Sequence, residues 1–67
     1  MEAQILNNKI KVFRAQHNLT QEELAEKIGV SRQTVVAIEK GKYLPTLGLA
    51  FCIAKVFNTT VDNLFSK

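Results

Sequence analysis

The three residues Gly29-Val30-Ser31 separate two short segments with helical sequence patterns, and this link restricts the possible folds more than any other feature. A link of this length that contains glycine makes consecutive helices cross at a sharp angle. Side chains inside such an angle have to be small or apolar, and Ala25 and Val30 meet this requirement. The sequence therefore predicts two tightly crossed helices between about residues 21 and 40.

Start and stop signals mark both helices of this pair. Thr20 and Glu23 match the capping box, in which each side chain accepts a hydrogen bond from the backbone amide of the other residue. Ser31 is a typical N-cap for the following helix. Gly29 and Gly41 stand where helices commonly end in a left-handed residue.

The remaining sequence also favours helices, because period-2 alternation is absent and only one proline occurs. Thr46 is a typical N-cap for a fourth helix, and a turn over residues 58–60 separates that helix from a short last one. A chain of 67 residues allows one domain, so residues 1–67 are expected to form a single compact all-α five-helix bundle. The expected helices cover about residues 3–16, 21–28, 32–40, 47–57 and 61–65.

Apolar residues that recur with the helical period of 3.6 residues predict the core. The fourth helix has more of them than one face can use, since Leu49 and Val56 lie on one side of its stripe and Phe51 on the other. Phe51 can still fill the core from its edge, and the surplus predicts a second buried surface. The core positions that the period predicts are Leu6, Ile10, Phe13, Leu24, Ala25, Ile28, Val35, Ile38, Leu47, Ala50, Ile53, Ala54 and Phe57.

The distribution of charge favours a polyanionic partner. The net charge is +3 and the pI is about 9.3. Arg32, Lys40 and Lys42 cluster in and after the third predicted helix, and a local basic patch of this kind attracts nucleic acid whatever its sequence. Solvated faces are expected for the remaining lysines Lys9, Lys11, Lys27 and Lys55.

Catalytic and metal-binding functions are disfavoured by the arrangement of the reactive residues. The one cysteine, Cys52, allows no intramolecular disulfide, which fits a reducing cytosol, and it is expected to be a small packing residue. His17 has no partner at the spacing of metal ligands. Glu22, Glu23 and Glu26 suit a helix N-terminus and solvent. We therefore expect no enzymatic activity, no metal, no cofactor and no small-molecule ligand.

The outward face of the third predicted helix has few charges and two short apolar side chains. Opposite the inward-pointing Val35 and Ile38, this face consists of Gln33, Val36, Ala37 and Lys40, with Arg32 and Thr34 on its flanks. Short side chains let a helix approach base edges in the DNA major groove, where an apolar group can meet a thymine methyl. Gln33 can bond bidentately to adenine, and Arg32 can reach guanine or a phosphate. Lys40 and Lys42 suit phosphates.

Residues 20–41, TQEELAEKIGVSRQTVVAIEKG, resemble the helix-turn-helix of the lambda-repressor/Cro-like (XRE-like) DNA-binding family. The stretches LTQEELA, GVSRQT and IEKGK are all close to the usual family pattern. The similarity extends to NNKIKVFRAQHNLT before this segment and to PTLGLAFCIAKVFNTTVDNLF after it. The resemblance implies a sequence-specific regulator from a prokaryote or phage whose third helix reads double-stranded DNA in the major groove.

The resemblance also implies roles for individual residues. Gln21 matches a position that binds a backbone phosphate, and Arg14 and Glu39 match a partly buried ion pair. Ala37 departs from relatives that carry a long polar side chain at its position, so the match provides no direct hydrogen bond there. Together with the helical wheel, the predicted base-contacting residues are Ser31, Arg32, Gln33, Val36 and Ala37, and the predicted phosphate-contacting residues are Gln21, Thr34, Lys40 and Lys42.

A homodimer is expected, because the final helices of such relatives often form a two-fold dimer and this chain has surplus apolar residues there. A two-fold dimer sets two recognition helices about 34 Å apart and favours a palindromic operator. Repression by occupying a promoter is then the simplest mechanism. The predicted interface residues are Leu49, Val56, Thr59, Val61 and Phe65.

Two other functions remain open at this point. One is an antitoxin-like module that binds DNA but acts by gripping a partner protein, and the other is a protein-interaction domain on the same fold. Gripping usually needs a long tail, and this chain stops two residues after Phe65. The longest apolar run, residues 47–54, is shorter than the ~20 residues of a membrane helix, and no signal-peptide pattern opens the chain, so a cytoplasmic protein is expected.

Overall fold

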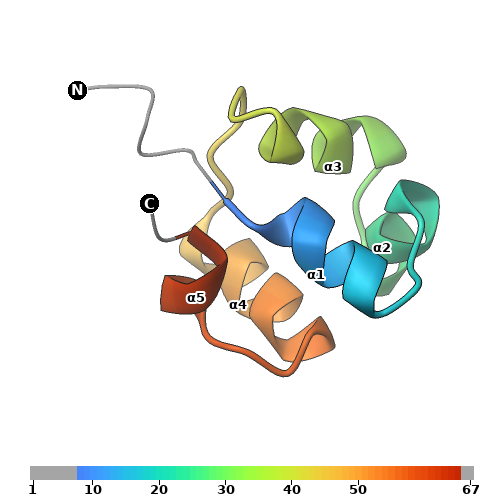
Figure 1. Ribbon diagram of the computed structural model, residues 1–67. Coiled ribbons are helices and arrows are strands. Elements are labelled where there is room, and N and C mark those ends of the chain that lie inside the picture. Colours follow the sequence, from blue (N-terminus) through green and yellow to red (C-terminus); the bar gives the residue numbers. More distant parts are fainter. Residues whose placement is uncertain (1–7, 66–67) are drawn as a thin grey trace.

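The computed structural model describes residues 8–65, which fold into five α-helices (Figure 1). In chain order these are α1 (Ile10–Gln16), α2 (Gln21–Ile28), α3 (Arg32–Glu39), α4 (Leu47–Val56) and α5 (Val61–Phe65). Residues 8–65 contain no strand, so the predicted all-α five-helix class is confirmed. The bounds of α2 to α5 agree with the predicted ranges to within one residue.

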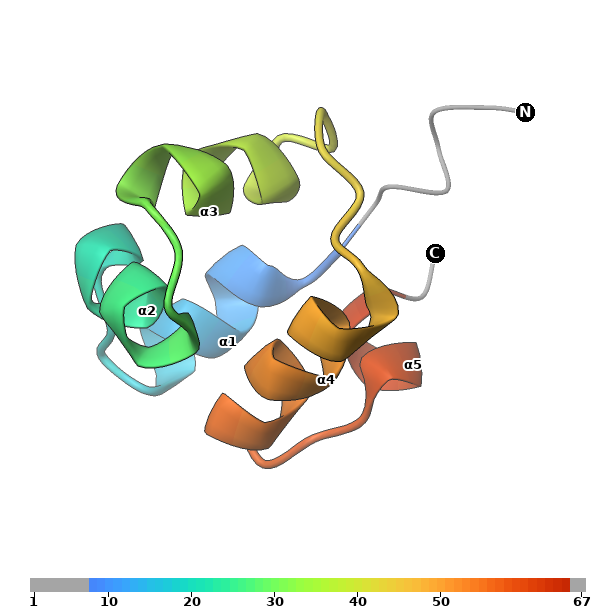
Figure 2. The same ribbon diagram turned by 180° about the vertical axis from the view of Figure 1, so that it is seen from behind.

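The helices surround α1 and place α3 at the surface of the domain. Figures 1 and 2 show α3 on one side of α1, with α4 and α5 on the other side. α2 packs against both α3 and α4, and α4 packs against α5. α3 is therefore supported from behind by α1 and α2, while α4 and α5 lie away from it.

α1 begins at Ile10, later than predicted. Asn8 and Lys9 are not helical, because their polar groups bond to distant parts of the fold. The Asn8 side chain donates a hydrogen bond to the Ile38 carbonyl at 2.8 Å, and the Lys9 amide donates one to the Leu64 carbonyl at 2.7 Å. These two bonds fasten the entry of α1 to α3 and α5.

Side-chain caps begin the helices where the sequence predicts them. Thr20 Oγ1 accepts a hydrogen bond from the Glu23 amide at 3.0 Å, and Glu23 Oε1 accepts one from the Thr20 amide at 2.9 Å. This completes the predicted capping box. The Ser31 and Thr46 hydroxyl oxygens each accept a hydrogen bond at 3.2 Å from the amide three residues further along the chain.

Each of the first four helices ends one or two positions before a residue with positive φ. The amide that follows this residue donates to the carbonyl five residues earlier, at 2.9–3.0 Å in each case. This closure satisfies carbonyls that would otherwise lack a partner at the end of a helix. Only glycine and, to a lesser degree, asparagine adopt this conformation readily. The four residues are Asn18, Gly29, Gly41 and Asn58.

The core is formed by all five helices and follows most of the predicted pattern. Phe13 and Ile28 are partly buried against it, and the predicted core residue Leu6 lies outside the described residues. The Phe13 and Phe57 rings stack with their centroids 5.7 Å apart. The buried apolar residues are Ile10, Leu24, Ala25, Val35, Ile38, Ala50, Ile53, Ala54, Phe57 and Leu64.

The predicted core position Leu47 is wrong, and Phe51 does not fill the core from its edge. Cys52, which was expected to be a small packing residue, is exposed as well. Leu47 is 67% exposed and Phe51 is 58% exposed. Ile53, which is fully buried, sets the inward direction of this helix. At about 100° per residue, Leu47 lies roughly 120° and Phe51 roughly 160° away from Ile53 around the helix axis. Both side chains therefore leave α4 on a face that the core does not cover.

Candidate nucleic-acid interface

The turn between α2 and α3 has the conformation that the sequence predicts. Gly29 has a φ of 76°, and the Val30 amide donates a hydrogen bond to the Ala25 carbonyl at 3.0 Å. A side chain at Gly29 would meet no neighbour within 4 Å, so the left-handed backbone and not the available space requires glycine here. Ala25 is buried at the crossing of the two helices. This turn fixes the direction in which α3 leaves α2.

The first turn of α3 presents long polar side chains to solvent. Arg32 and Gln33 are exposed. Ser31 Oγ caps the helix through the Thr34 amide and lies 3.0 Å from Thr34 Oγ1, which is half-buried. The hydroxyl of Ser31 therefore has a structural role in the free protein in addition to its predicted contact with bases.

The outward face of α3 is less open than the helical wheel predicts. Val36 and Ala37 are half-buried, whereas Lys40 is exposed. Val36 lines a pocket between α1, α2 and α3, which accounts for its reduced exposure. The part of α3 that is open to a ligand is thus concentrated at its N-terminal turn, around Arg32 and Gln33.

An ion pair joins α1 to the last residue of α3. Arg14 Nε lies 2.7 Å from Glu39 Oε2, and Arg14 Nη2 donates to Glu39 Oε1 at 3.3 Å. The two side chains are only 15% and 8% exposed. Arg14 Nη1 also donates to the Leu19 carbonyl at 2.9 Å, and Gln21 Nε2 donates to Glu39 Oε1 at 3.2 Å. This network of four hydrogen bonds connects α1, the start of α2 and the end of α3.

A pocket of about 230 Å³ opens beside this ion pair. Gln21 and Lys40, two of the four residues predicted to contact phosphates, line it together. The other two lie elsewhere, with Thr34 at the start of α3 and Lys42 exposed in the turn after it. Lys11 of α1 completes the cationic lining, although the sequence analysis placed it on a solvated face. Lys11 precedes Arg14 by three residues, which puts the two side chains on one face of a helix. This spacing is the feature of the sequence that could have placed Lys11 beside the ion pair.

Most residues of the predicted dimer interface pack on the domain itself. Leu49, Val56, Val61 and Phe65 are partly buried against the core. The Thr59 hydroxyl accepts a hydrogen bond from Asn63 Nδ2 at 3.1 Å. That these five residues contact a second copy stays a prediction.

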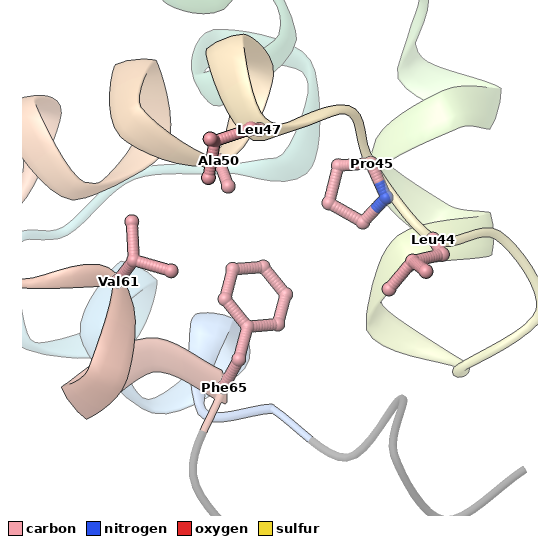
Figure 3. Close-up of a pocket in the computed structure, with 6 residues that line it drawn as sticks. All are labelled: Leu44, Pro45, Leu47, Ala50, Val61 and Phe65. Carbon is pink, nitrogen blue, oxygen red and sulfur yellow. The ribbon is translucent and has the colours of Figure 1, made fainter.

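The exposed apolar side chains on this side of the domain are different ones. Leu44, Leu47 and Phe51 are all more than half exposed. Leu44 and Leu47 help to line a groove of about 300 Å³ between α4 and α5, and Figure 3 shows the six residues that border it. They are Leu44, Pro45, Leu47, Ala50, Val61 and Phe65. All six side chains of this groove are apolar, in contrast to the pocket beside Arg14.

Metal and membrane sites do not occur in the described part of the chain. Between residues 8 and 65, no group of three potential metal-ligating side chains comes together. Over the same residues, none of the helices has both the length and the apolar character needed to cross a membrane.

Comparison with known proteins finds relatives that match nearly the whole chain. A family model described as helix-turn-helix matches residues 10–64. An HTH-type transcriptional regulator from Methanocaldococcus jannaschii is 62% identical over 60 residues, which cover 90% of this chain and 91% of that protein. YgzD, an HTH-type transcriptional regulator from Bacillus subtilis, is 48% identical with coverages of 90% and 91%. A crystal structure of a hypothetical transcription factor from Neisseria matches with a TM-score of 0.81 at 25% identity, covering 94% of this chain and 72% of that one.

Proposed function

Because the chain belongs to the XRE or lambda-repressor-like helix-turn-helix family of DNA-binding transcriptional regulators, we propose that α3 reads a specific operator in the major groove. The protein is a transcriptional regulator and not an enzyme. The proposal goes further than the family, since it assigns the reading of bases to particular side chains of this chain. The observation that carries it is the exposed N-terminal turn of α3, held on two supporting helices.

Arg32 and Gln33 are the principal base-reading residues of this proposal. Both are exposed, and their long side chains can reach base edges when the first turn of α3 lies in the groove. Arginine forms bidentate hydrogen bonds with guanine O6 and N7, and glutamine forms them with adenine N6 and N7. The shorter side chains of Ser31, Val36 and Ala37 also contact bases. Lys42 binds a phosphate from the turn that follows α3.

Repression is the regulatory outcome that we propose. A domain that occupies an operator inside a promoter competes directly with RNA polymerase for the same DNA. Such competition needs no activity beyond tight and specific binding. A reporter gene under a promoter that contains the selected operator should therefore be expressed less when the protein is present.

Selection of bound duplexes from a random pool tests the central proposal. We expect enrichment of one sequence made of two inverted half-sites, with centres about 10 base pairs apart. Enrichment of a single half-site would retain base recognition by α3 and contradict the two-fold dimer. Recovery of unselected sequence at low salt, where any basic domain binds DNA, would contradict specific recognition altogether.

The proposed dimer uses the face of α4 and α5 that carries Leu47 and Phe51. These two exposed residues are four apart and lie on one stripe of α4. Phe51 borders a second hollow that it shares with Thr59 and Val61, and Val61 also lines the apolar groove. A protruding aromatic ring beside an apolar groove can fit the same pair of features on a second copy, as a two-fold interface requires. Leu49 and Val56 leave α4 on other sides, roughly 140–160° from Phe51.

Phe51→Lys is expected to convert the dimer into a monomer. A lysine in place of the ring would bring a charge without a partner into the apolar groove of the other copy, which costs several kcal/mol. Sedimentation equilibrium measures the mass of the species, and Val12→Lys on α1 is the matched control because Val12 is 53% exposed but lines neither hollow. A wild-type protein that sediments as a monomer at micromolar concentration, or a Phe51→Lys variant that still dimerises, would contradict this interface.

A further inference from the structure

We propose that Asn8 is a positioning residue for DNA recognition, because its side chain fixes the last turn of α3 and thereby the direction in which this helix enters the major groove. Asn8 acts through α3 and contacts no base itself, so its role rests on the proposed function and deepens it. Asn8 Nδ2 donates a hydrogen bond to the Ile38 carbonyl at 2.8 Å, across 30 positions of the sequence. Asn8 is half-buried, so water is partly excluded from this bond.

The two ends of α3 are held by different parts of the fold. The turn before Ser31 and the side-chain cap of this residue fix the first turn of α3 relative to α2. The last turn is held from α1 through the ion pair between Arg14 and Glu39. Asn8 supplies a second attachment at the adjacent Ile38 carbonyl, from the other end of α1. Two attachments at separate points keep a helix from swinging about either one, so Asn8 sets the tilt of α3.

Base recognition is more sensitive to this tilt than binding to the DNA backbone is. Gln33 precedes Ile38 by five residues, or roughly 7.5 Å along the helix axis, so a swing of α3 displaces the reading side chain. Hydrogen bonds to base edges need donor–acceptor distances of about 2.7–3.2 Å, and a recognition site has to be held to within about 0.5 Å. Lysine contacts to phosphates tolerate such a displacement, since they depend on charge and on a flexible side chain.

The distant bond of Asn8 can be removed while its local bond is kept. Asn8 Oδ1 accepts a hydrogen bond from the Ile10 amide at 3.2 Å, which supports the start of α1. Serine makes the same kind of short-range bond to the backbone, but its hydroxyl is one bond closer to the main chain and loses the contact with Ile38. The Ile38 carbonyl also accepts a hydrogen bond from the Gly41 amide at 3.0 Å. Because this partner remains in Asn8→Ser, the variant should stay folded.

Two affinities measured for the same protein test the positioning role. The probes are fluorescein-labelled duplexes of equal length, the operator selected from the random pool and a scrambled version of it, titrated by anisotropy at about 150 mM salt. In Asn8→Ser, we expect the ratio of the two affinities to fall by at least about fivefold, the value of one bidentate contact. The affinity for the scrambled duplex should stay within about twofold of the wild-type value, because phosphate contacts carry no sequence information.

Thr46→Ala is the matched control for a loss of stability. It removes the N-cap of α4, whose hydroxyl bonds to the Leu49 amide in the same helix and not to α3. A smaller folded fraction lowers both affinities by the same factor, so the ratio should keep its wild-type value in this variant. Unfolding in urea, followed by circular dichroism, measures the stability of both variants.

The outcomes separate the role of Asn8 from the proposed function. If the wild type prefers its operator and Asn8→Ser keeps the full ratio, Asn8 does not position α3 and the proposed function stands. An equal fall of the ratio in Thr46→Ala, or an Asn8→Ser variant that is unfolded, would assign the effect to stability and overturn the positioning role. If the wild type binds both duplexes equally, the proposed reading of bases and the role of Asn8 are both overturned.

Discussion

Arg14→Met is expected to remove roughly 3–5 kcal/mol from the free energy of unfolding. The substitution leaves the Glu39 carboxylate, which is 8% exposed in the intact pair, with the Gln21 amide as its remaining side-chain donor. It also removes the hydrogen bond between the guanidinium and the Leu19 carbonyl. Since the core of a domain this small supplies only about 3–5 kcal/mol, the variant should be largely unfolded at 25 °C, as far-ultraviolet circular dichroism would report.

Removing both partners of the ion pair is expected to cost less than removing one. The double variant Arg14→Met/Glu39→Leu leaves no buried charge without a partner, so much of the cooperative unfolding transition should return. Arg32→Met is the matched control, because Arg32 is exposed, and its effect should stay within about 0.5 kcal/mol. If the single and double variants were equally unstable, the contribution of Arg14 would lie in packing and not in its charge.

Gln33→Ala is expected to relax sequence discrimination at one or two base pairs of each half-site. A bidentate contact to a base is worth about 1–3 kcal/mol of discrimination, which corresponds to roughly 5- to 150-fold in relative affinity. Gln33 is exposed at the first turn of α3, so its truncation should leave the stability of the domain nearly unchanged. Competition between the selected operator and its single-base variants measures this change.

Lys42→Ala provides the contrasting result for the same assay. Lys42 is exposed in the turn after α3, and a lysine that contacts a phosphate carries no base preference. Its loss should weaken binding to all duplexes by a similar factor and lower the salt slope by about 1. If Gln33→Ala and Lys42→Ala changed every sequence alike, Gln33 would not read bases.

The local elements of this protein follow from short stretches of its sequence. The capping box of Thr20 and Glu23, the N-caps Ser31 and Thr46, and the left-handed Gly29 all occur where their residue types predict them. Each of these features depends on bonds between residues at most five apart. Such bonds need no partner that is distant in the chain, so a local pattern is enough to predict them, and four of the five helices have nearly their predicted bounds.

The sequence by itself therefore determined the crossed pair α2 and α3, and with it the family. Only the tertiary structure decided that α1 starts at Ile10, that Phe51 stays exposed, and that Lys11 lies beside Lys40. These features depend on hydrogen bonds and packing between helices distant in the chain, as between Asn8 and Ile38, which are 30 residues apart. A helical period states which residues share a face, but the neighbour that covers this face is set by how the helices pack.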